Sequence, residues 1–327
     1  MSNKIQSVST LEQLEKLIDL KPEERAWFER ATDRDLSFLI PPQFSNKLGV
    51  DAIRRQFVPN VHEFDESSFT DDPQNEYKFT VSPFLVHRYK NRVAFTITDK
   101  CFGYCRHCFR RRFTSNSAPC TKSDITKAAA YIKSHSEIEE ILITGGDPLT
   151  LSNGFLKETF RMLREASPNL IIRLCTRCLS VYPARFDDEL LSIMREYNES
   201  APLFLLTQFN SRHEFSKETS KIAKKITRLG IAIFNQSVLL RGVNDTKDEF
   251  VALCYLLLQN RIKPYYAFQG DDVKGTEHLI ITIDEALKLE DEVRDELSGL
   301  EMPTFMKDRD NGRGKIPLIA LKASKNA

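Results

Sequence analysis

Short apolar segments of strand length alternate with longer helical segments along most of this chain, and no other feature constrains its fold as strongly. The apolar segments are residues 92–98, 140–145, 170–176, 202–208, 231–236 and 265–269. Strands that alternate with helices predict βαβ units and a parallel sheet, whose strands are continuously apolar because helices cover both faces. Six such units predict an α/β fold, either an incomplete (β/α)6 barrel or a strongly curved open sheet. Ligands are then expected at the carboxyl ends of the strands.

The first 80 residues differ in texture from the rest. Residues 10–35 carry Leu11, Leu14 and Leu17 at helical spacing among charges, which predicts short amphipathic helices. Residues 36–80 contain prolines and Asp/Asn clusters with little periodicity, and 65–78 is typical of an exposed connection. We therefore expect an N-terminal helical and irregular extension, residues 1–80, followed by a core of residues 81–327.

Composition excludes several classes of protein. With 41% hydrophobic and 28% charged residues, the chain has the balance of a globular protein with a sizeable core. A net charge of +1 provides no overall field that would attract nucleic acid or a membrane surface. There is no apolar run of membrane-spanning length, and the N-terminus lacks the apolar core of a secretory signal. We expect a cytoplasmic protein that binds neither nucleic acid nor membrane.

Three of the seven cysteines follow the first apolar segment, as Cys101, Cys105 and Cys108 in the spacing CxxxCxxC. Three thiolates are one ligand short of a closed zinc site or a fully protein-ligated iron–sulfur cluster. A cubane cluster on three cysteines keeps one iron open, which the amino and carboxylate groups of S-adenosylmethionine can fill. The alternatives are unligated thiols or a zinc site completed by His107. Three exposed cysteines on one loop are nevertheless costly unless bound or reactive.

This cysteine motif after the first strand resembles the radical S-adenosylmethionine enzymes. The longer string CFGYCRHCFRRRF, residues 101–113, resembles more narrowly the lysine 2,3-aminomutase family, and the resemblance extends from about residue 82 to residue 318. It implies a [4Fe-4S] cluster on the three cysteines, used together with S-adenosylmethionine and pyridoxal 5′-phosphate. It also implies a one-electron reductant of the flavodoxin or ferredoxin type as a partner, and it leaves a homo-oligomer open.

Two further blocks match the family's nucleoside site. Gly145, Gly146 and Asp147 follow the strand 140–145 and resemble the GGD motif that receives the methionyl amino group. The glycines allow close backbone approach, and Asp147 is expected to pair with the ammonium. Alone, this motif would equally be an Asp-Pro turn. Gln236 matches a glutamine that lies near the nucleoside.

The resemblance assigns the pyridoxal site to Lys315, which occupies the position of the family's Schiff-base lysine. A buried lysine beside a phosphate can lower its pKa and act as a nucleophilic amine, whereas alone this residue would be interpreted as a solvated lysine. The family's glycine run before the lysine is interrupted here, at residues 311 and 313. Arg88, Tyr89 and Arg92 match the segment that packs on the pyridoxal ring and phosphate, although a surface basic patch would have the same sequence.

The substrate residues are assigned by the same resemblance. Arg110 matches the residue that binds the substrate carboxylate, and Asp271 and Asp308 match the two acids that hold the side-chain ammonium of lysine. Two acids around a buried cation form charge-assisted hydrogen bonds and reject glutamate by like-charge repulsion. The alternatives are a nucleic-acid patch at residues 110–112 and loop caps for the two acids. Asp272, beside Asp271, leaves a one-position ambiguity.

Zinc is not expected in this chain. The structural zinc of the family's lysine enzymes uses a cysteine where Thr246 stands here, and further cysteines in a C-terminal extension. The short, zinc-less form resembles the branch that makes (R)-β-lysine for elongation factor P, yet that branch lacks the acid present here as Asp308. The pathway therefore stays open.

The sequence predicts an isomerase, a radical aminomutase that moves the α-amino group of L-lysine to C3 to give β-lysine. An aminomutase for arginine or glutamate is the alternative within the same class. A non-enzymatic iron–sulfur regulatory or RNA-binding protein is the alternative from another class.

Overall fold

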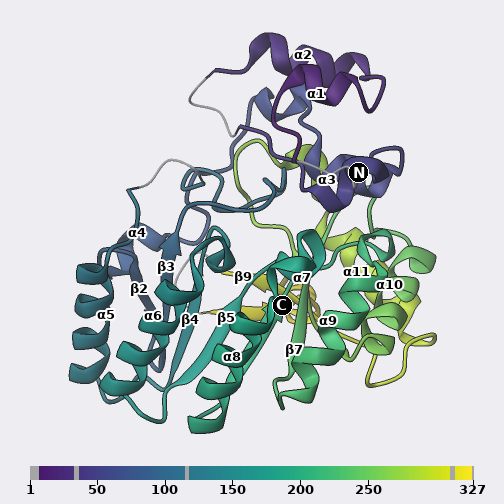
Figure 1. Ribbon diagram of the computed structural model, residues 1–327. Coiled ribbons are helices and arrows are strands. Elements are labelled where there is room, and N and C mark those ends of the chain that lie inside the picture. Colours follow the sequence, from purple (N-terminus) through teal and green to yellow (C-terminus); the bar gives the residue numbers. More distant parts are fainter. Residues whose placement is uncertain (1–6, 33–36, 115–117, 310–313, 326–327) are drawn as a thin grey trace.

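The computed structural model describes residues 7–32, 37–114, 118–309 and 314–325 of the chain. Its centre is a ten-stranded sheet in which each strand pairs with the next along the chain, from β1 to β10 (Figure 1). The strands are β1 (Thr80–Ser82), β2 (Leu85–Tyr89), β3 (Arg92–Thr98), β4 (Glu140–Gly145), β5 (Ile171–Cys175), β6 (Leu203–Thr207), β7 (Ile233–Leu239), β8 (Ile262–Gln269), β9 (Thr304–Asp308) and β10 (Lys315–Pro317).

The strands from β3 to β9 are all parallel, whereas β1, β2 and β10 pair antiparallel at the two edges. In the described residues the sheet is open, because the strand order runs from β1 to β10 without closing. The predicted α/β fold, an incomplete barrel, is confirmed. The six predicted strands correspond to β3 through β8, and the four edge strands were not predicted.

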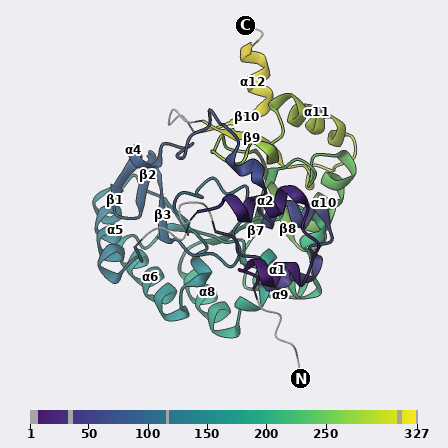
Figure 2. The ribbon, with the colours of Figure 1, turned by 90° about the horizontal axis from the view of Figure 1, so that it is seen from above.

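Helices follow the parallel strands and surround them when the molecule is seen from above (Figure 2). They are α5 (Lys122–Ser134), α6 (Asn153–Ala166), α7 (Cys178–Val181), α8 (Asp188–Ser200), α9 (Lys217–Arg228), α10 (Lys247–Gln259), α11 (Ile283–Arg294) and α12 (Leu318–Lys325). Thr121, Ser152 and Ser216 start α5, α6 and α9, since each hydroxyl accepts the N–H of the residue three positions on. No helix in the described ranges is long and apolar enough to cross a membrane.

Burial alternates along the strands. Ile141 and Ile143 of β4, and Ile172 and Leu174 of β5, are fully buried in the core under the helices. Their neighbours on the opposite face, such as Arg173, are only partly buried and line a hollow inside the sheet. The expectation that both faces are covered was therefore wrong for the inner face. An incomplete barrel leaves room there for polar side chains and a ligand.

The N-terminal extension contains α1 (Leu11–Glu15), α2 (Pro22–Arg30), α3 (Asp51–Phe57) and α4 (Glu76–Phe79), and its first three helices lie at one end of the barrel (Figure 1). The predicted helices within 10–35 are present. Residues 40–58, in contrast, are not the irregular connection that was expected. They form the 3-10 helix η1 (Pro42–Lys47) and α3, and their apolar side chains pack into a cluster with Trp27.

The extension packs against the cysteine loop that follows β3. The Tyr104 N–H donates to the Leu39 carbonyl at 2.9 Å, and the Arg106 N–H donates to the Gln56 carbonyl at 2.8 Å. Since the parallel strands end at the same edge of the sheet, these contacts place the extension over their carboxyl ends.

Candidate active site

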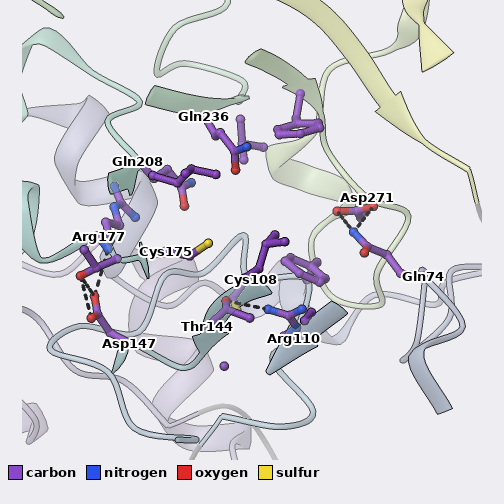
Figure 3. A pocket seen from close by; sticks show the side chains of 18 of the residues that line it. Gln74, Cys108, Arg110, Thr144, Asp147, Cys175, Arg177, Gln208, Gln236 and Asp271 are labelled. Carbon is purple, nitrogen blue, oxygen red and sulfur yellow. Dashed lines mark hydrogen bonds between the residues drawn. The ribbon is translucent and has the colours of Figure 1, made fainter. Parts of the chain in front are cut away.

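A cavity of about 520 Å³ lies inside the sheet at the carboxyl ends of the strands. Every residue that the sequence predicted for the site lines this cavity: Arg88, Tyr89, Arg92, Cys101, Cys105, Cys108, Arg110, Gly145, Gly146, Asp147, Gln236, Asp271, Asp308 and Lys315. Figure 3 shows several of them converging from different strands. Residues more than 200 positions apart in the sequence therefore meet in one space.

The cluster end of the cavity is formed by the loop after β3. Cys101, Cys105 and Cys108 are free thiols that all line the cavity. Burial raises the pKa of the Cys101 and Cys108 thiols, and the neighbouring cysteines raise it further because thiolates repel one another. Among the described residues, no three His, Cys, Asp or Glu side chains converge as the ligands of a single ion. Three thiols that come from one loop and line one cavity fit an iron–sulfur cluster, which takes one thiolate on each ligated iron.

Arg177 contacts this end and was not singled out from the sequence. Its Nη1 donates to Cys105 Sγ at 2.7 Å, and its Nη2 donates to Gln56 Oε1 at 2.6 Å and Glu214 Oε2 at 3.1 Å. Glu214 is fully buried and also accepts the Ser180 hydroxyl and two backbone N–H groups. The Cys105 sulfur is therefore held by a guanidinium that belongs to a buried polar network. The position of Arg177 just after an apolar strand was the available signal.

The glycines of the GGD motif bring two loops into contact. The Gly146 N–H donates to the Thr98 carbonyl at 2.5 Å, and the Asp147 N–H donates to the Lys100 carbonyl at 2.7 Å. A Cβ at Gly145 would lie 2.3 Å from the Thr98 oxygen, and one at Gly146 would lie 2.3 Å from the Lys100 oxygen. The close approach that requires glycine here is therefore to the cysteine loop itself.

The Asp147 carboxylate is buried and bonded within the chain. It accepts the Thr176 hydroxyl at 2.7 Å and the N–H groups of Leu149 and Arg177 at 3.0 Å each. Burial raises the pKa of Asp147 to about 6, although these hydrogen bonds oppose the shift. The sequence led us to expect a pairing with the methionyl ammonium. The structure shows the carboxylate joining the loop after β4 to the loop after β5, and the pairing with the ammonium stays a prediction.

His107, considered above as a zinc ligand, also lines the cavity. Its Nε2 lies 3.1 Å from Gln208 Nε2 and 3.2 Å from Asn210 Nδ2, so it faces two amide groups. Burial holds the pKa of His107 well below its usual value, which keeps the ring neutral.

The opposite end of the cavity contains Lys315, opposite Asp308 in the antiparallel pair of β9 and β10. Lys315 Nζ lies 3.3 Å from Asp308 Oδ2 and 5.8 Å from the centre of the Tyr89 ring. Gly314 has φ +81°, and a Cβ there would lie 2.8 Å from Tyr89, so glycine is required before the lysine. Residues 311 and 313, which interrupt the glycine run, lie outside the described ranges.

Arg88 supplies an unsatisfied cation at this end. Its side chain is 6% exposed, and its Nη1 lies 3.8 Å from Asp308. Within the described part of the chain, its Nε and Nη2 are buried without a hydrogen-bond partner. The Arg92 guanidinium lies 3.7 Å from the centre of the Tyr89 ring. Buried guanidinium donors without a partner suit a phosphate, and an aromatic ring beside a lysine amine suits a planar aldehyde cofactor. These residues therefore fit pyridoxal phosphate.

Asp271 and its neighbour Asp272 differ in their surroundings. Asp271 lines the cavity, and Gln74 Nε2 donates to both of its oxygens at 3.4 Å. Burial, followed by the charge of Asp308, raises the pKa of Asp271 to about 7. The Asp272 side chain is half exposed and pairs with Lys307 at 2.9 Å. Of the two, Asp271 is the one available to a ligand in the cavity.

Arg110 is already paired with a carboxylate from the N-terminal extension. Its Nε and Nη2 donate to Glu76 Oε1 at 2.9 and 2.7 Å, and its Nη1 donates to Thr144 Oγ1 at 3.1 Å. Arg111 pairs with Glu63, and Arg112 pairs with both Asp72 and Glu76. The three arginine side chains are only 11–14% exposed, so they do not form a surface patch for nucleic acid.

These acidic partners and Gln74 were not predicted from the sequence. All of them lie in a polar stretch before the barrel, within or next to the segment that was predicted to be an exposed connection. That segment is indeed largely exposed, but the Glu76 side chain is only 12% exposed. No local pattern in the sequence distinguishes it from the surrounding surface acids.

Comparison with known proteins agrees with the cysteine motif and the barrel. Residues 95–254 match the family model described as the Radical SAM superfamily, which covers β3 through most of α10. Radical S-adenosylmethionine enzymes carry a [4Fe-4S] cluster and use S-adenosylmethionine with an external reductant. The cofactor predictions for the cluster and S-adenosylmethionine are thus confirmed at the level of the family.

Similar curated proteins cover almost the whole chain. An Aquifex aeolicus protein, named provisionally as an L-lysine 2,3-aminomutase, is 37% identical over 95% of this chain and 85% of its own length. The L-lysine 2,3-aminomutase of Acetoanaerobium sticklandii is 36% identical over 95% of this chain and 76% of its own length. The glutamate 2,3-aminomutase of Clostridioides difficile is 32% identical over 98% of this chain and 75% of its own length. This chain belongs to the radical S-adenosylmethionine aminomutase family that includes the lysine 2,3-aminomutases, and it is an isomerase.

Proposed function

We propose that this protein moves the α-amino group of L-lysine to C3, with pyridoxal phosphate held covalently by Lys315. The observation that carries the proposal is the cavity itself. It brings three thiols, an amine beside a buried unsatisfied guanidinium, and two neighbouring buried carboxylates into one space. When bound, the cluster with S-adenosylmethionine supplies hydrogen abstraction by a deoxyadenosyl radical, and pyridoxal phosphate supplies a π system through which an amino group can migrate.

The chain's own residues determine which amino acid fits. Arg110 has guanidinium donors left for an α-carboxylate, while Asp271 and Asp308 offer negative charge to a side-chain cation. In the structure Lys315 is the counter-ion of Asp308, at 3.3 Å. Asp308 therefore binds a cation at this place in the cavity, and a substrate ammonium can take that place. A glutamate side chain would instead meet two like charges.

Burial supports the chemistry in a second way. Asp147 is buried and the Arg110 side chain is only 11% exposed, and burial raises the pKa of both Asp147 and Asp271. Exclusion of water strengthens the charged contacts that orient a substrate and protects reactive species from side reactions. A cytoplasmic location and a flavodoxin- or ferredoxin-type reductant complete the proposal.

An anaerobic assay tests the substrate. The enzyme, reconstituted with iron, sulfide, pyridoxal phosphate and S-adenosylmethionine and reduced with dithionite, is given lysine, arginine and glutamate separately, and the products are separated by chromatography. We expect β-lysine from lysine and little turnover of glutamate. Preferred turnover of glutamate or arginine would reassign the substrate, and failure of all three amino acids would refute the proposed substrate.

The cofactor lysine is tested without turnover. Borohydride reduction followed by mass spectrometry should find a pyridoxyl group on Lys315, and Lys315→Ala should lose it while retaining iron. Lys307→Ala is the matched control, because Lys307 is on the same hairpin but pairs with Asp272. A pyridoxyl group on another lysine would refute the assignment.

A further inference from the structure

One short segment of the N-terminal extension reaches both ends of the proposed substrate position. Gln74 and Glu76 both line the cavity, and only Asn75, in the left-handed conformation with φ 53°, separates them. Gln74 contacts Asp271 and Glu76 contacts Arg110. In Figure 3, Gln74 points to Asp271 on one side, and Arg110 lies beside Thr144 on the other.

The contacts of Arg110 leave one edge of its guanidinium available. A guanidinium has five N–H donors. Glu76 takes Nε and one donor of Nη2, and Thr144 takes one donor of Nη1. Among the described residues, one N–H on each of the two terminal nitrogens is left. The remaining Nη2 donor lies on the outer edge, which Nη1 and Nη2 share, so a ligand carboxylate can accept a hydrogen bond from that edge.

Glu76 is itself held in place. Arg112 Nη2 donates to Glu76 Oε2 at 3.0 Å and to Asp72 Oδ1 at 2.8 Å. Arg110 and Glu76 are 11% and 12% exposed, so water competes weakly for these groups. The carboxylate that orients Arg110 therefore cannot readily follow a rotation of the guanidinium.

We propose that Glu76 and Gln74 are positioning residues for the two ends of the amino-acid substrate. Glu76 fixes Arg110 so that its outer edge receives the α-carboxylate, and Gln74 fixes the Asp271 carboxylate that receives the side-chain cation. This inference rests on the proposed function for the identity of the two ends. Because both residues belong to one segment, that segment sets the distance between the two anchors.

A competing interpretation predicts the opposite change in ligand affinity when Glu76 is removed. Glu76 is a carboxylate on the proposed carboxylate-binding arginine, so it could occupy the substrate's place and have to leave before binding. Its removal would then strengthen the binding of carboxylate ligands. If Glu76 positions Arg110, removal of Glu76 weakens the binding of carboxylate ligands.

Two truncated ligands separate the ends of the site. Norleucine retains the α-carboxylate and lacks the side-chain ammonium, whereas cadaverine retains the ammonium groups and lacks the carboxylate. Calorimetric titration of the holoenzyme measures both dissociation constants without turnover. Glu76→Gln should weaken norleucine about tenfold or more, the scale of a lost charge-assisted hydrogen bond, and leave cadaverine unchanged. Gln74→Leu should weaken the binding of cadaverine severalfold and leave the binding of norleucine unchanged.

The matched control is Glu66→Gln, the same change at an exposed position of the same segment. It should change neither dissociation constant. Equal losses in Glu66→Gln and Glu76→Gln would show an effect that is not specific to Arg110 and would overturn the proposal.

The remaining outcomes also distinguish the two interpretations of Glu76. Tighter norleucine binding in Glu76→Gln supports the competing interpretation and overturns ours. Should Glu76→Gln not fold, Gln74→Leu removes no charge and still decides, because equal weakening of both ligands in it contradicts the proposal. If the wild-type enzyme acts on an amino acid other than lysine, the proposed function fails. The Glu76 experiment is then run with that amino acid and its decarboxylated amine.

Discussion

The two ends of the cavity are built from different kinds of contact. At the cluster end, backbone hydrogen bonds of 2.5 and 2.7 Å join the GGD loop to the cysteine loop, and glycines make that approach sterically feasible. At the end that contains Lys315, charged side chains from β2, β9 and β10 meet around Asp308 at 3.3–3.8 Å. Short backbone contacts fix a geometry before any ligand arrives. Longer contacts between side-chain charges can be exchanged for contacts to a ligand, which is what a site for a covalent cofactor and a substrate needs.

Removal of any cluster cysteine should have the largest effect. Cys101→Ala, Cys105→Ala and Cys108→Ala should each abolish reductive cleavage of S-adenosylmethionine, since each removes one of only three protein ligands. Cys120→Ala should retain cleavage, because Cys120 is buried away from the cavity lining. Chromatography of 5′-deoxyadenosine measures the effect, and full cleavage by Cys105→Ala would contradict the cluster assignment.

At the substrate end, loss of one acid should reduce activity without abolishing it. Asp271→Asn leaves a substrate cation partly unpaired, which should cost about 2–5 kcal/mol, or roughly 30-fold or more in kcat/KM for lysine. Asp272→Asn should have much less effect, because Asp272 pairs with Lys307 outside the cavity lining. Steady-state kinetics on the two variants measure the difference. Equal losses of kcat/KM in the two variants would show that Asp271 does not bind the substrate cation.

The pH dependence of cation binding is a second test of the role of Asp271. The pKa of Asp271 is about 7, because burial and Asp308 raise it more than Gln74, Lys315 and Lys307 lower it. The carboxyl group is thus neutral below that pH and charged above it, so cadaverine should bind about tenfold more weakly at pH 6 than at pH 8. Titrations across this range measure the shift. Asp271→Asn should remove most of it, and an unchanged dependence in that variant would assign the titration to another group.

The smallest effect concerns the backbone contact at the cluster end. Gly146→Ala forces a Cβ toward the Lys100 carbonyl and should lower the free energy of unfolding by about 1–3 kcal/mol. Gly154→Ala is the control, since nothing lies within 4 Å of its Cβ position in α6. It should be neutral or stabilising. Denaturant unfolding of both variants compares them, and equal stabilities would mean that the two loops are not rigidly joined.

The sequence was sufficient to predict the barrel but not the parts of the N-terminal extension that pack over the carboxyl ends of its strands. Strands β3 through β8 follow from apolar segments of the right length, and the cysteine and GGD motifs follow from their positions after strands. The residues at 40–58 were expected to be irregular, because their apolar side chains lack helical spacing. They are buried in a cluster with residues distant in the sequence, such as Trp27 and Val181. Glu76 and Gln74 could not be predicted, since their roles depend on partners 34 and 197 positions away.

The transfer of deuterium tests the central claim, that both ends of the cavity act on one lysine molecule. Lysine deuterated at C3 is incubated anaerobically with the reduced holoenzyme, and the products and recovered S-adenosylmethionine are analysed by mass spectrometry. The account predicts that deuterium appears both in β-lysine and at the 5′ carbon of recovered S-adenosylmethionine. Cleavage of S-adenosylmethionine with no deuterium transferred from lysine, while glutamate deuterated at C3 transfers it, would contradict the account.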